Sequence, residues 1–408
     1  MQTTDPRAEL NLSRLAPGFG VVGLVGVLAY WGMMFAGNHD AFGSFMFGWF
    51  FWLSLTIGLF TLTILNHATR AQWTLAVLRL LESGGSAINF AAMLVMFAPI
   101  LIMPKHLYEW VDKALVDADP FLKRKEFFLN QPGWTVRVLF VFVFCVAVAA
   151  WYRNSVRKQE QTGEFKLEQR RLQASGVILF VFALLATMFL TDLVMSMEPH
   201  WSSTMYGPWQ LVAGMGVALA FCLVIQCTNA GKAPFKEVVH KELLRDQGLM
   251  LFAFTMLWGY TSISQFLIIW NGNLPETTSY FVKRSSAMHP PGMEANHWGA
   301  LGLLLILGRF FIPFFVLLAP RTRTKAMNLA RIAGWIFVMH IFDMYMLVIP
   351  AVHGRAALGP LSPNLFLDLG AWISVGCLWM ALFAWQTRQA SLLPRIDTRL
   401  QEAKAHAH

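Results

Sequence analysis

Residues 41–66, AFGSFMFGWFFWLSLTIGLFTLTILN, contain no Asp, Glu, Lys or Arg and decide the fold class. An α-helix rises about 1.5 Å per residue, so about 20 apolar residues cross the hydrocarbon core of a bilayer. Inside that core every backbone N–H and C=O group must be paired within the segment, and a single helix meets this requirement. The run therefore predicts a helix that spans a membrane.

Similar apolar runs recur along the chain. The expected spans are residues 17–37, 41–66, 86–104, 134–152, 173–197, 207–228, 248–270, 297–319, 329–351 and 364–386. None of them shows the alternation that barrel strands require. The sequence predicts an all-α polytopic membrane protein with about ten transmembrane helices. These form a single transmembrane domain, 17–386, between an N-terminal tail, 1–16, and a C-terminal tail, 387–408.

Composition excludes a soluble enzyme. The chain is 56% hydrophobic and only 13% charged, whereas soluble domains carry about 25% charged residues. The formal net charge is +9, but the basic residues lie in short segments between apolar runs and do not gather on a folded domain. We therefore expect lipids, and no nucleic acid, as partners.

The basic residues also predict the orientation of the chain. With ten crossings both tails lie on one side, and most of the 32 Lys and Arg residues fall in these tails and in the loops on the same side. Positive residues stay on the cytoplasmic face, so both termini are expected to be cytoplasmic. The longest outer loops, 105–133 and 271–296, are expected to cap the outer surface or to contact a partner.

No motif for a covalently held redox centre or a metal site is present. The four cysteines all lie inside apolar runs, without Cys-x-x-Cys, haem-attachment or iron–sulfur spacing. A haem b would need two histidines at matching depth on facing helices, and no helix interior offers a partner for His340.

Ionisable residues within the expected spans are the first candidates for a functional site, because each costs several kcal/mol in hydrocarbon. Arg309 is always charged and needs a partner, for which Asp343 or Asp192 is expected. His340 and Asp343, three residues apart, share one helix face. A static pair that fixes helix packing and a proton relay through His340 and Asp343 are both compatible with this pattern.

Two further groups of polar residues are weaker candidates. Tyr260, Ser264 and Gln265 could extend a relay, and His67 near the cytoplasmic end of 41–66 is either the point where protons enter or an interfacial cap. At the outer interface a helix end or aromatic belt is the simpler interpretation, and a quinone headgroup site is the alternative. These interfacial residues are Glu198, His200 and Trp201.

One short segment between the second and third spans has a helical pattern of its own. Its apolar positions run from Trp73 to Leu81 at helical spacing, opposite Gln72, Arg79 and Glu82. This pattern predicts a short helix lying in the membrane interface.

Several sequence blocks resemble the F subunit of bacterial alternative complex III. They spread over roughly residues 41–351 in the family's order, and the Glu-Pro-His-Trp and Ser-Gln-x-x-x-Ile-Trp blocks are the most specific. The blocks include Phe47 to Ser54, His67 to Trp73, Glu198-Pro-His-Trp201, Ser264-Gln265-Phe-Leu-Ile-Ile-Trp270 and His340-Ile-Phe-Asp343.

The resemblance implies a fold and a place in an enzyme complex. Such subunits are similar to the NrfD and polysulfide-reductase membrane subunits, with two four-helix bundles flanked by an extra helix at each end. The complex lies in the bacterial inner membrane and oxidises a quinol, menaquinol or ubiquinol. Its electrons pass through an iron–sulfur subunit and multihaem and monohaem cytochrome c subunits to a cytochrome c or a terminal cytochrome oxidase.

The resemblance also implies a division of labour inside the complex. Quinol chemistry is attributed to the paralogous C subunit, while the F subunit holds no redox cofactor and is proposed to carry a proton path. Carried over by position, Asp192, His340 and Asp343 would form the relay, with Arg309 holding them in place. A quinone-binding anchor, a purely structural anchor and a free-standing proton-coupled transporter remain alternatives.

Overall fold

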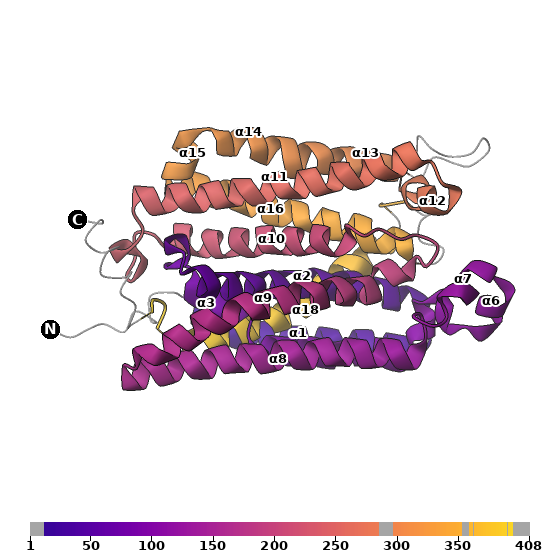
Figure 1. The fold of residues 1–408 in the computed structure, drawn as a ribbon, viewed down its shortest axis with the longest axis horizontal. Coiled ribbons are helices and arrows are strands. Elements are labelled where there is room, and N and C mark those ends of the chain that lie inside the picture. Colours follow the sequence, from indigo (N-terminus) through magenta and orange to yellow (C-terminus); the bar gives the residue numbers. More distant parts are fainter. Residues whose placement is uncertain (1–11, 285–296, 353–358, 362, 390, 395–408) are drawn as a thin grey trace.

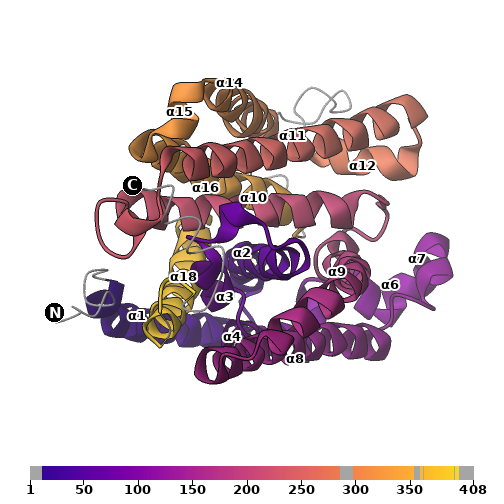
Figure 2. The ribbon, with the colours of Figure 1, turned by 60° about the vertical axis from the view of Figure 1, so that its left-hand side comes forward.

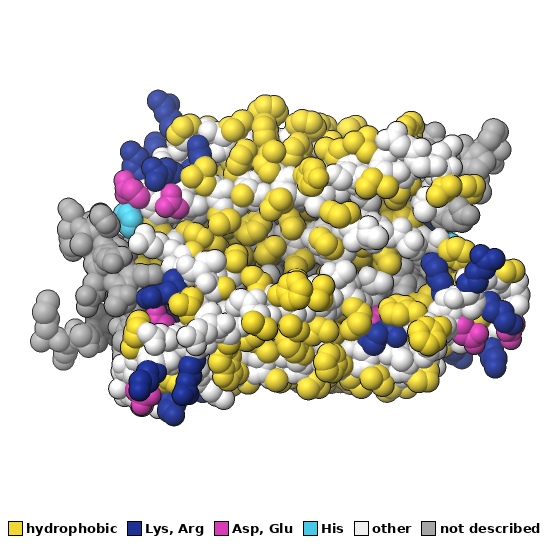
Figure 3. Space-filling view, in the orientation of Figure 1, with side chains coloured by type: hydrophobic (Ala, Val, Ile, Leu, Met, Phe, Trp, Pro, Cys, Tyr) yellow, Lys and Arg dark blue, Asp and Glu magenta, His cyan; other side chains and the backbone are white. Residues whose placement is uncertain are grey.

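The protein is all-helical in a computed structural model that describes all residues except 1–11, 285–296, 353–358, 362, 390 and 395–408. Within the described residues, nine helices are long and apolar enough to cross a membrane, and no strand is present. On the face shown in Figure 3, hydrophobic side chains cover the middle and charged side chains gather towards the two ends. The predicted fold class is confirmed, and the chain is a multi-pass membrane protein.

The long helices run side by side along the longest axis (Figure 1). Seven of them, together with one shorter helix, form two groups of four. The first bundle contains α2 (His39–Thr69), α4 (Ala87–Met96), α8 (Gln131–Thr162) and α9 (Phe165–Leu193). The second contains α10 (Tyr206–Thr228), α11 (Lys241–Gly272), the segment from α13 (Trp298–Leu305) to α14 (Ile312–Leu318), and α16 (Ala326–Val348). Figure 2 shows the bundles as two layers, with α2 between them.

A pair of helices flanks the bundles. The first helix, α1 (Leu12–Phe35), packs mainly along α18 (Leu365–Arg388), and α18 in turn packs on α2. Gly26 permits the approach of α1, because a Cβ there would overlap the Ser374 side chain. The flanking helices therefore pack mainly on each other, α18 packs on α2, and α1 also contacts the first bundle through Trp31, which donates a hydrogen bond to the Met96 carbonyl.

Short helices lie at the two ends of the molecule. One end carries α6 (Lys113–Ala118), α7 (Pro120–Lys125) and α12 (Pro275–Lys283), and we call it the α12 end. The other end carries α3 (Leu78–Gly84) and α15 (Pro320–Thr324), and we call it the α15 end.

The third apolar run differs from the expected continuous span of 86–104. It forms two short helices, α4 and α5 (Ala98–Ile102), that meet at Phe97. Pro99 explains the break, because its ring removes the N–H group that would bond to the Val95 carbonyl and clashes with the preceding turn. This run is too short to count among the nine long helices, and it accounts for the difference from ten.

The segment after α2 also differs from the prediction of one interfacial helix. It forms a short turn of helix, η1 (Gln72–Thr74), followed by α3. Arg79 is buried and pairs with Glu82 at 2.5 Å and with Glu160 of α8. The polar face of α3 is therefore packed against α8 and is not presented to solvent.

The two bundles meet where α2 crosses α10. Nearly all of α2 is buried, as expected for a helix with neighbours on every side. A Cβ at Gly58 would overlap the carbonyl oxygen of Gly214, so the backbones of α2 and α10 touch at this crossing. Glycine is required at Gly58 because any side chain would push the bundles apart.

The substitution Gly58→Val is expected to destabilise the protein by at least about 2 kcal/mol, because the added side chain meets backbone that cannot move aside. Thermal unfolding of the purified protein in mild detergent measures the effect. The matched control is Gly176→Val on α9, where a Cβ meets nothing within 4 Å. Equal losses of stability in the two variants would contradict the assignment of this crossing.

Candidate functional site

The buried arginine of the second bundle lies in an irregular turn. Between α13 and α14 the chain forms a π-helical segment, η7 (Ile306–Phe311), that contains Arg309. The N–H group of Ile312 bonds to the carbonyl of Leu307, five residues back, where a regular α-helix would bond four residues back. Single π turns inside α-helices are common at functional sites.

The sequence around Arg309 explains this wide turn. Continued by one residue, the five-residue pattern would bond residue 313 to the carbonyl of Gly308, but Pro313 has no N–H group. The Gly308 carbonyl instead accepts a hydrogen bond of 2.7 Å from the indole Nε1–H of Trp335 on α16. Trp335 therefore satisfies the carbonyl that Pro313 leaves without a backbone donor.

Arg309 and Asp343 form an ion pair inside the second bundle. The Nε atom of Arg309 lies 3.1 Å from Oδ2 of Asp343, and both side chains are about 5% exposed. The guanidinium also lies over the ring of Trp258 on α11, 4.8 Å from its centroid. The expected pairing of Arg309 with Asp343 is confirmed.

His340 joins this pair to the first bundle. Its Nδ1 atom lies 3.9 Å from Oδ2 of Asp343, close for a charge contact but too long for a hydrogen bond. Its Nε2 atom lies 3.2 Å from the hydroxyl oxygen of Ser54 on α2, and His340 is fully buried. The residues Ser54, Arg309, His340 and Asp343 form what we call the Asp343 cluster. The cluster draws side chains from both bundles.

Asp192 belongs to a different ion pair. Arg137 of α8 donates two hydrogen bonds to its carboxylate, of 2.7 and 2.8 Å. No hydrogen bond or ion pair between described residues joins Asp192 to Arg309, His340 or Asp343. The interpretation of Asp192 as a member of their relay is therefore not supported by the geometry. The bidentate contact is typical of a structural pair that ties α8 to α9.

The polar residues of α11 do not extend the Asp343 cluster. Tyr260 is 66% exposed and points away from the bundle interior. Gln265 is buried but accepts a hydrogen bond of 2.9 Å from Ser203, towards the α12 end. Ser264 is partly exposed. No hydrogen bond or ion pair between described residues joins Tyr260, Ser264 or Gln265 to the Asp343 cluster, so their part in a relay stays a prediction.

Glu198 forms a buried ion pair at the α12 end. Its carboxylate lies 2.9 Å from Nη1 of Arg284, the residue that follows α12. Arg284 also donates hydrogen bonds of 3.0 and 2.9 Å to the carbonyls of Met346 and Leu347. These carbonyls belong to the last turn of α16, where a cation is favoured by the helix dipole. Arg284 therefore fixes α12 to the helix that carries Asp343.

A small pocket, with room for no more than about one water molecule, adjoins this ion pair. Trp201 stacks on Tyr280 with ring centroids 4.1 Å apart, and the Nε1–H of Trp201 and the hydroxyl of Tyr206 have no hydrogen-bond partner among the described residues. Burial, opposed by Arg284 and reinforced by the charges of Glu198 and Asp343, raises the pKa of Tyr280 to about 12. The pocket therefore brings two unpaired donors next to the Glu198–Arg284 ion pair.

His200 is separated from the other two interfacial candidates. It lies on the surface, 3.2 Å from Asp119, and stacks on Phe121 of α7. The three candidates Glu198, His200 and Trp201 therefore do not form one site, because only Glu198 and Trp201 line the pocket.

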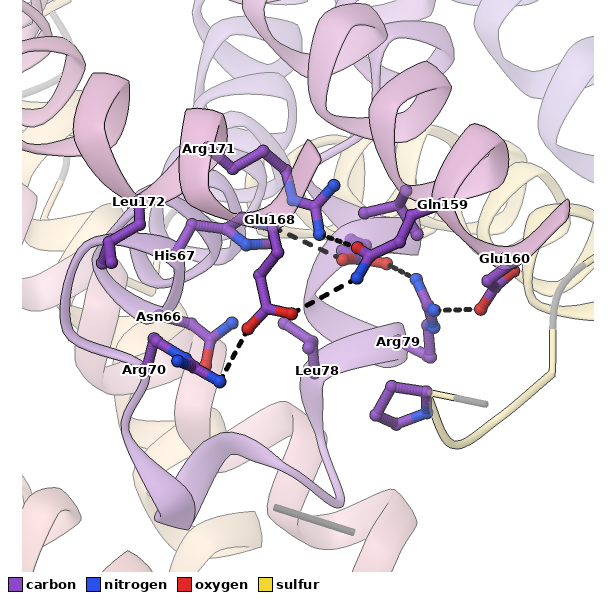
Figure 4. A pocket seen from close by; sticks show the side chains of 13 residues that line it. Asn66, His67, Arg70, Leu78, Arg79, Gln159, Glu160, Glu168, Arg171 and Leu172 are labelled. Carbon is purple, nitrogen blue, oxygen red and sulfur yellow. Dashed lines mark hydrogen bonds and ion pairs between the residues drawn. The ribbon is translucent and has the colours of Figure 1, made fainter. Parts of the chain in front are cut away.

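His67 lies in a separate charged cluster at the α15 end, in the first bundle. We call it the His67 cluster, and Figure 4 shows its side chains around a pocket. His67 lies 3.6 Å from Glu82 and stacks on Tyr152 of α8, with centroids 4.7 Å apart. The other charged members are Arg70, Arg79, Glu160, Glu168 and Arg171.

The His67 cluster holds helix ends together. Arg70 at the end of α2 pairs with Glu168 of α9 at 2.7 Å, and Arg171 bonds to Gln159 of α8. Burial tends to raise the pKa of the Glu82 carboxyl, but the charge of Arg79 and the contact with His67 lower this pKa to about 2. No described hydrogen bond or ion pair joins this cluster to the Asp343 cluster. The interfacial role expected for His67 fits this arrangement.

Several residues of these sites lie outside the sequence-based candidates. Three of them contact a residue that is far away in the chain: Ser54, Arg137 and Arg284. Asp368 of α18 is fully buried and accepts hydrogen bonds from Ser44 at 2.5 Å and Tyr345 at 3.1 Å. The sequence could have indicated Asp368, because it is a single acidic residue in the first turn of an otherwise apolar helix.

Comparison with protein-family models and with functionally characterised proteins finds no match for this chain. The class of the protein therefore follows from its architecture: it is an α-helical, multi-pass membrane protein with a buried charge cluster in each bundle.

The variant Arg137→Gln is expected to destabilise the protein by about 3–5 kcal/mol, because it leaves the Asp192 carboxylate buried without its counter-charge. Adding Asp192→Asn removes that charge and should restore most of the loss. Thermal unfolding in detergent measures both variants. A double variant no more stable than Arg137→Gln alone would show that the pair is not the source of the effect.

The stability contributed by Glu82 should depend on pH. Since the folded state lowers the pKa of Glu82 from 4.5 to about 2, its contribution is present above pH 4.5 and is lost as the pH falls towards 2. The difference in unfolding temperature between the parent and Glu82→Gln should therefore be largest at neutral pH and shrink in acid. Asp117→Asn, at an exposed pair with Lys123, is the control and should show little difference.

Proposed function

We propose that the chain is an integral membrane subunit of a respiratory quinol:cytochrome c, or quinol:oxidase-linked, oxidoreductase of the alternative complex III type. In this role it supplies scaffold and a transmembrane proton path and carries no redox centre of its own. The observation that carries the proposal is the Asp343 cluster, a carboxylate, an imidazole and a guanidinium buried between helices of an apolar bundle.

The chemistry of the cluster suits proton transfer. Removal from water favours the neutral acid at Asp343, whereas the Arg309 charge 3.1 Å away favours the carboxylate. These opposing effects give the carboxyl access to both protonation states. His340 lies between Asp343 and the Ser54 hydroxyl. A proton passes between Asp343 and His340 when the 3.9 Å that separates them closes to hydrogen-bond distance.

The sequence resemblance supports the assignment to a quinol-oxidising complex. Quinol oxidation releases protons and electrons together, and an assembly that passes electrons to haem needs a separate route for the protons. The two four-helix bundles with a flanking pair of helices are compatible with the architecture that the resemblance implies. If both termini are cytoplasmic, as the sequence predicts, the α15 end lies on the cytoplasmic side of the membrane.

A quinone-binding anchor is the second candidate function. The pocket beside Glu198 favours it, because Trp201 and Tyr206 line this pocket. The Nε1–H of Trp201 and the hydroxyl of Tyr206 have no hydrogen-bond partner among the described residues and could donate to a quinone oxygen once the pocket widens to admit the ring. In this case the pocket, and not the Asp343 cluster, would be the functional site.

The variant Asp343→Asn tests the proposed proton path in the intact complex reconstituted into vesicles. We expect quinol-driven cytochrome c reduction to stay within about twofold of the parent and proton translocation to fall at least about tenfold, because the amide cannot carry the proton. A pH-sensitive dye inside the vesicles measures translocation. Assembly is checked by co-purification with the haem-bearing subunits.

Two further variants separate transport from structure. Asp343→Asn with Arg309→Gln removes both charges and should recover stability but not translocation. The pair Arg137→Gln with Asp192→Asn removes the other buried ion pair and should translocate protons normally. Normal translocation in an assembled Asp343→Asn complex would rule out the path.

A further inference from the structure

The connection from α14 to α16 carries positive charge without negative charge. Its segment 321–331, RTRTKAMNLAR, contains four basic residues, and the sequence has no Asp or Glu from residue 295 to residue 342. Figure 3 shows Lys and Arg side chains gathered where Figure 1 draws α15, with acidic side chains over the start of α11. The acidic residues at that start, Glu242 and Asp246, are matched by two basic residues of α11. They therefore leave the charge of 321–331 uncancelled.

One of the four basic residues is used by the fold. Nη2 of Arg323 donates a hydrogen bond of 3.3 Å to the carbonyl of Leu318 at the end of α14. A Cβ at Gly248 would lie 2.7 Å from Cγ of Arg323, so this side chain also packs against α11. The other three basic side chains are exposed, and no described residue forms an ion pair or a side-chain hydrogen bond with them: Arg321, Lys325 and Arg331.

Arg331 lies within a membrane span and not beyond its end. The span Ala326–Ala351 has 26 residues, so it is about 39 Å long and exceeds the hydrocarbon core by about 9 Å. If both ends share this excess, the backbone of Arg331 lies about 3 Å inside the hydrocarbon edge. Side chains tilt towards the N-terminus of their helix, so the guanidinium reaches back to the headgroup layer. An anion in that layer would stabilise its charge.

The face of α16 around Arg331 is apolar and exposed. Met327, one turn before Arg331, is 51% exposed, and Trp335, one turn after it, is 37% exposed. Residues four apart lie on one face of a helix, and Val338 extends this exposed stripe. The indole N–H of Trp335 bonds to the Gly308 carbonyl, which fixes the position of the ring. An acyl chain along this stripe would lie directly below a headgroup held by Arg331.

We propose that Arg321, Lys325 and Arg331 bind the phosphate of one anionic phospholipid, with an acyl chain along Met327 and Trp335. We call this the Arg331 site. It is a lipid-binding site at the α15 end of the second bundle. It does not depend on proton translocation or quinol oxidation, so it stands or falls separately from the proposed function.

Two features favour a lipid with a net negative charge. No side chain caps the start of α16 at Lys325, so the first N–H groups of this 23-residue helix can donate to phosphate oxygens. A zwitterionic lipid also brings a cationic group, which the three basic side chains would repel. Phosphatidylglycerol has the preferred charge. An acidic segment of a partner protein would meet the charge but not the apolar stripe beneath it.

Native mass spectrometry of the full chain, purified in mild detergent, tests the Arg331 site. Added phosphatidylglycerol should be retained as one molecule per chain and should bind more tightly than phosphatidylcholine. The double variant Arg321→Gln with Arg331→Gln should weaken phosphatidylglycerol binding roughly twentyfold, because each basic residue near an anionic lipid contributes about fivefold. Equal binding of the two lipids by the parent chain would overturn the site.

A matched control separates a defined site from overall charge. The double variant Lys232→Gln with Lys236→Gln removes two exposed basic residues from the connection between α10 and α11, also at the α15 end. It should bind phosphatidylglycerol like the parent chain. The same weakening in both double variants would show that only net charge matters, and the site would be rejected.

Arg331→Leu isolates the central residue and protects the test against misfolding. It extends the apolar stripe, so the unfolding temperature without added lipid should equal or exceed that of the parent, while phosphatidylglycerol binding should fall about fivefold. Arg331→Lys keeps the charge and should retain most of the binding. Full binding by the folded Arg331→Leu variant would exclude Arg331 as a lipid ligand.

Two soluble probes identify other occupants. Inorganic phosphate should not displace phosphatidylglycerol at equal concentration, because it has no acyl chain to place on the stripe. Equal displacement would mean that the three side chains bind any phosphate and that the lipid is not the ligand. A hexaglutamate peptide should bind no better to the parent than to Arg331→Leu. Binding of the peptide to the parent alone, without retained lipid, would make this surface a protein contact and overturn the proposal.

Discussion

The second bundle is organised around one electrostatic constraint, the need to pair the charge of Arg309 away from water. A guanidinium cannot lose its proton at ordinary pH, so its burial demands a counter-charge and aromatic or polar neighbours. Asp343 provides the charge and Trp258 the ring. The π turn places Arg309 within reach of both, and it exists because Pro313 and Trp335 together replace a backbone hydrogen bond.

The ion pairs Arg137–Asp192 and Arg309–Asp343 have the same chemical groups but different geometry. Arg137 grips Asp192 with two short hydrogen bonds, which leaves the carboxylate little freedom. Arg309 meets Asp343 by a single contact, has one nitrogen without a hydrogen-bond partner among the described residues, and has His340 beside it. The first geometry is typical of a static pair between helices. Under the proposed function, the second belongs to a site that changes its charge.

The sequence predicted the features that depend on neighbouring residues in the chain, and it missed contacts between residues that are far apart in the chain. Hydropathy predicted the spans because each helix satisfies its own backbone, and it missed the break at Pro99 because a proline interrupts a helix without making the run less apolar. Asp343 was correctly named among the possible partners of Arg309. Ser54 and Arg284 were not predicted, because their partners lie on helices that only tertiary packing brings near.

The connection of Arg284 to α16 links the buried cluster to a surface. The last turn of α16 leaves carbonyl groups that a cation can satisfy, and Arg284 does so at Met346 and Leu347, one turn beyond Asp343. The same guanidinium holds Glu198, which follows α9 of the first bundle. A partner subunit that shifts α12 would therefore pull on α16 and on the connection between the bundles together.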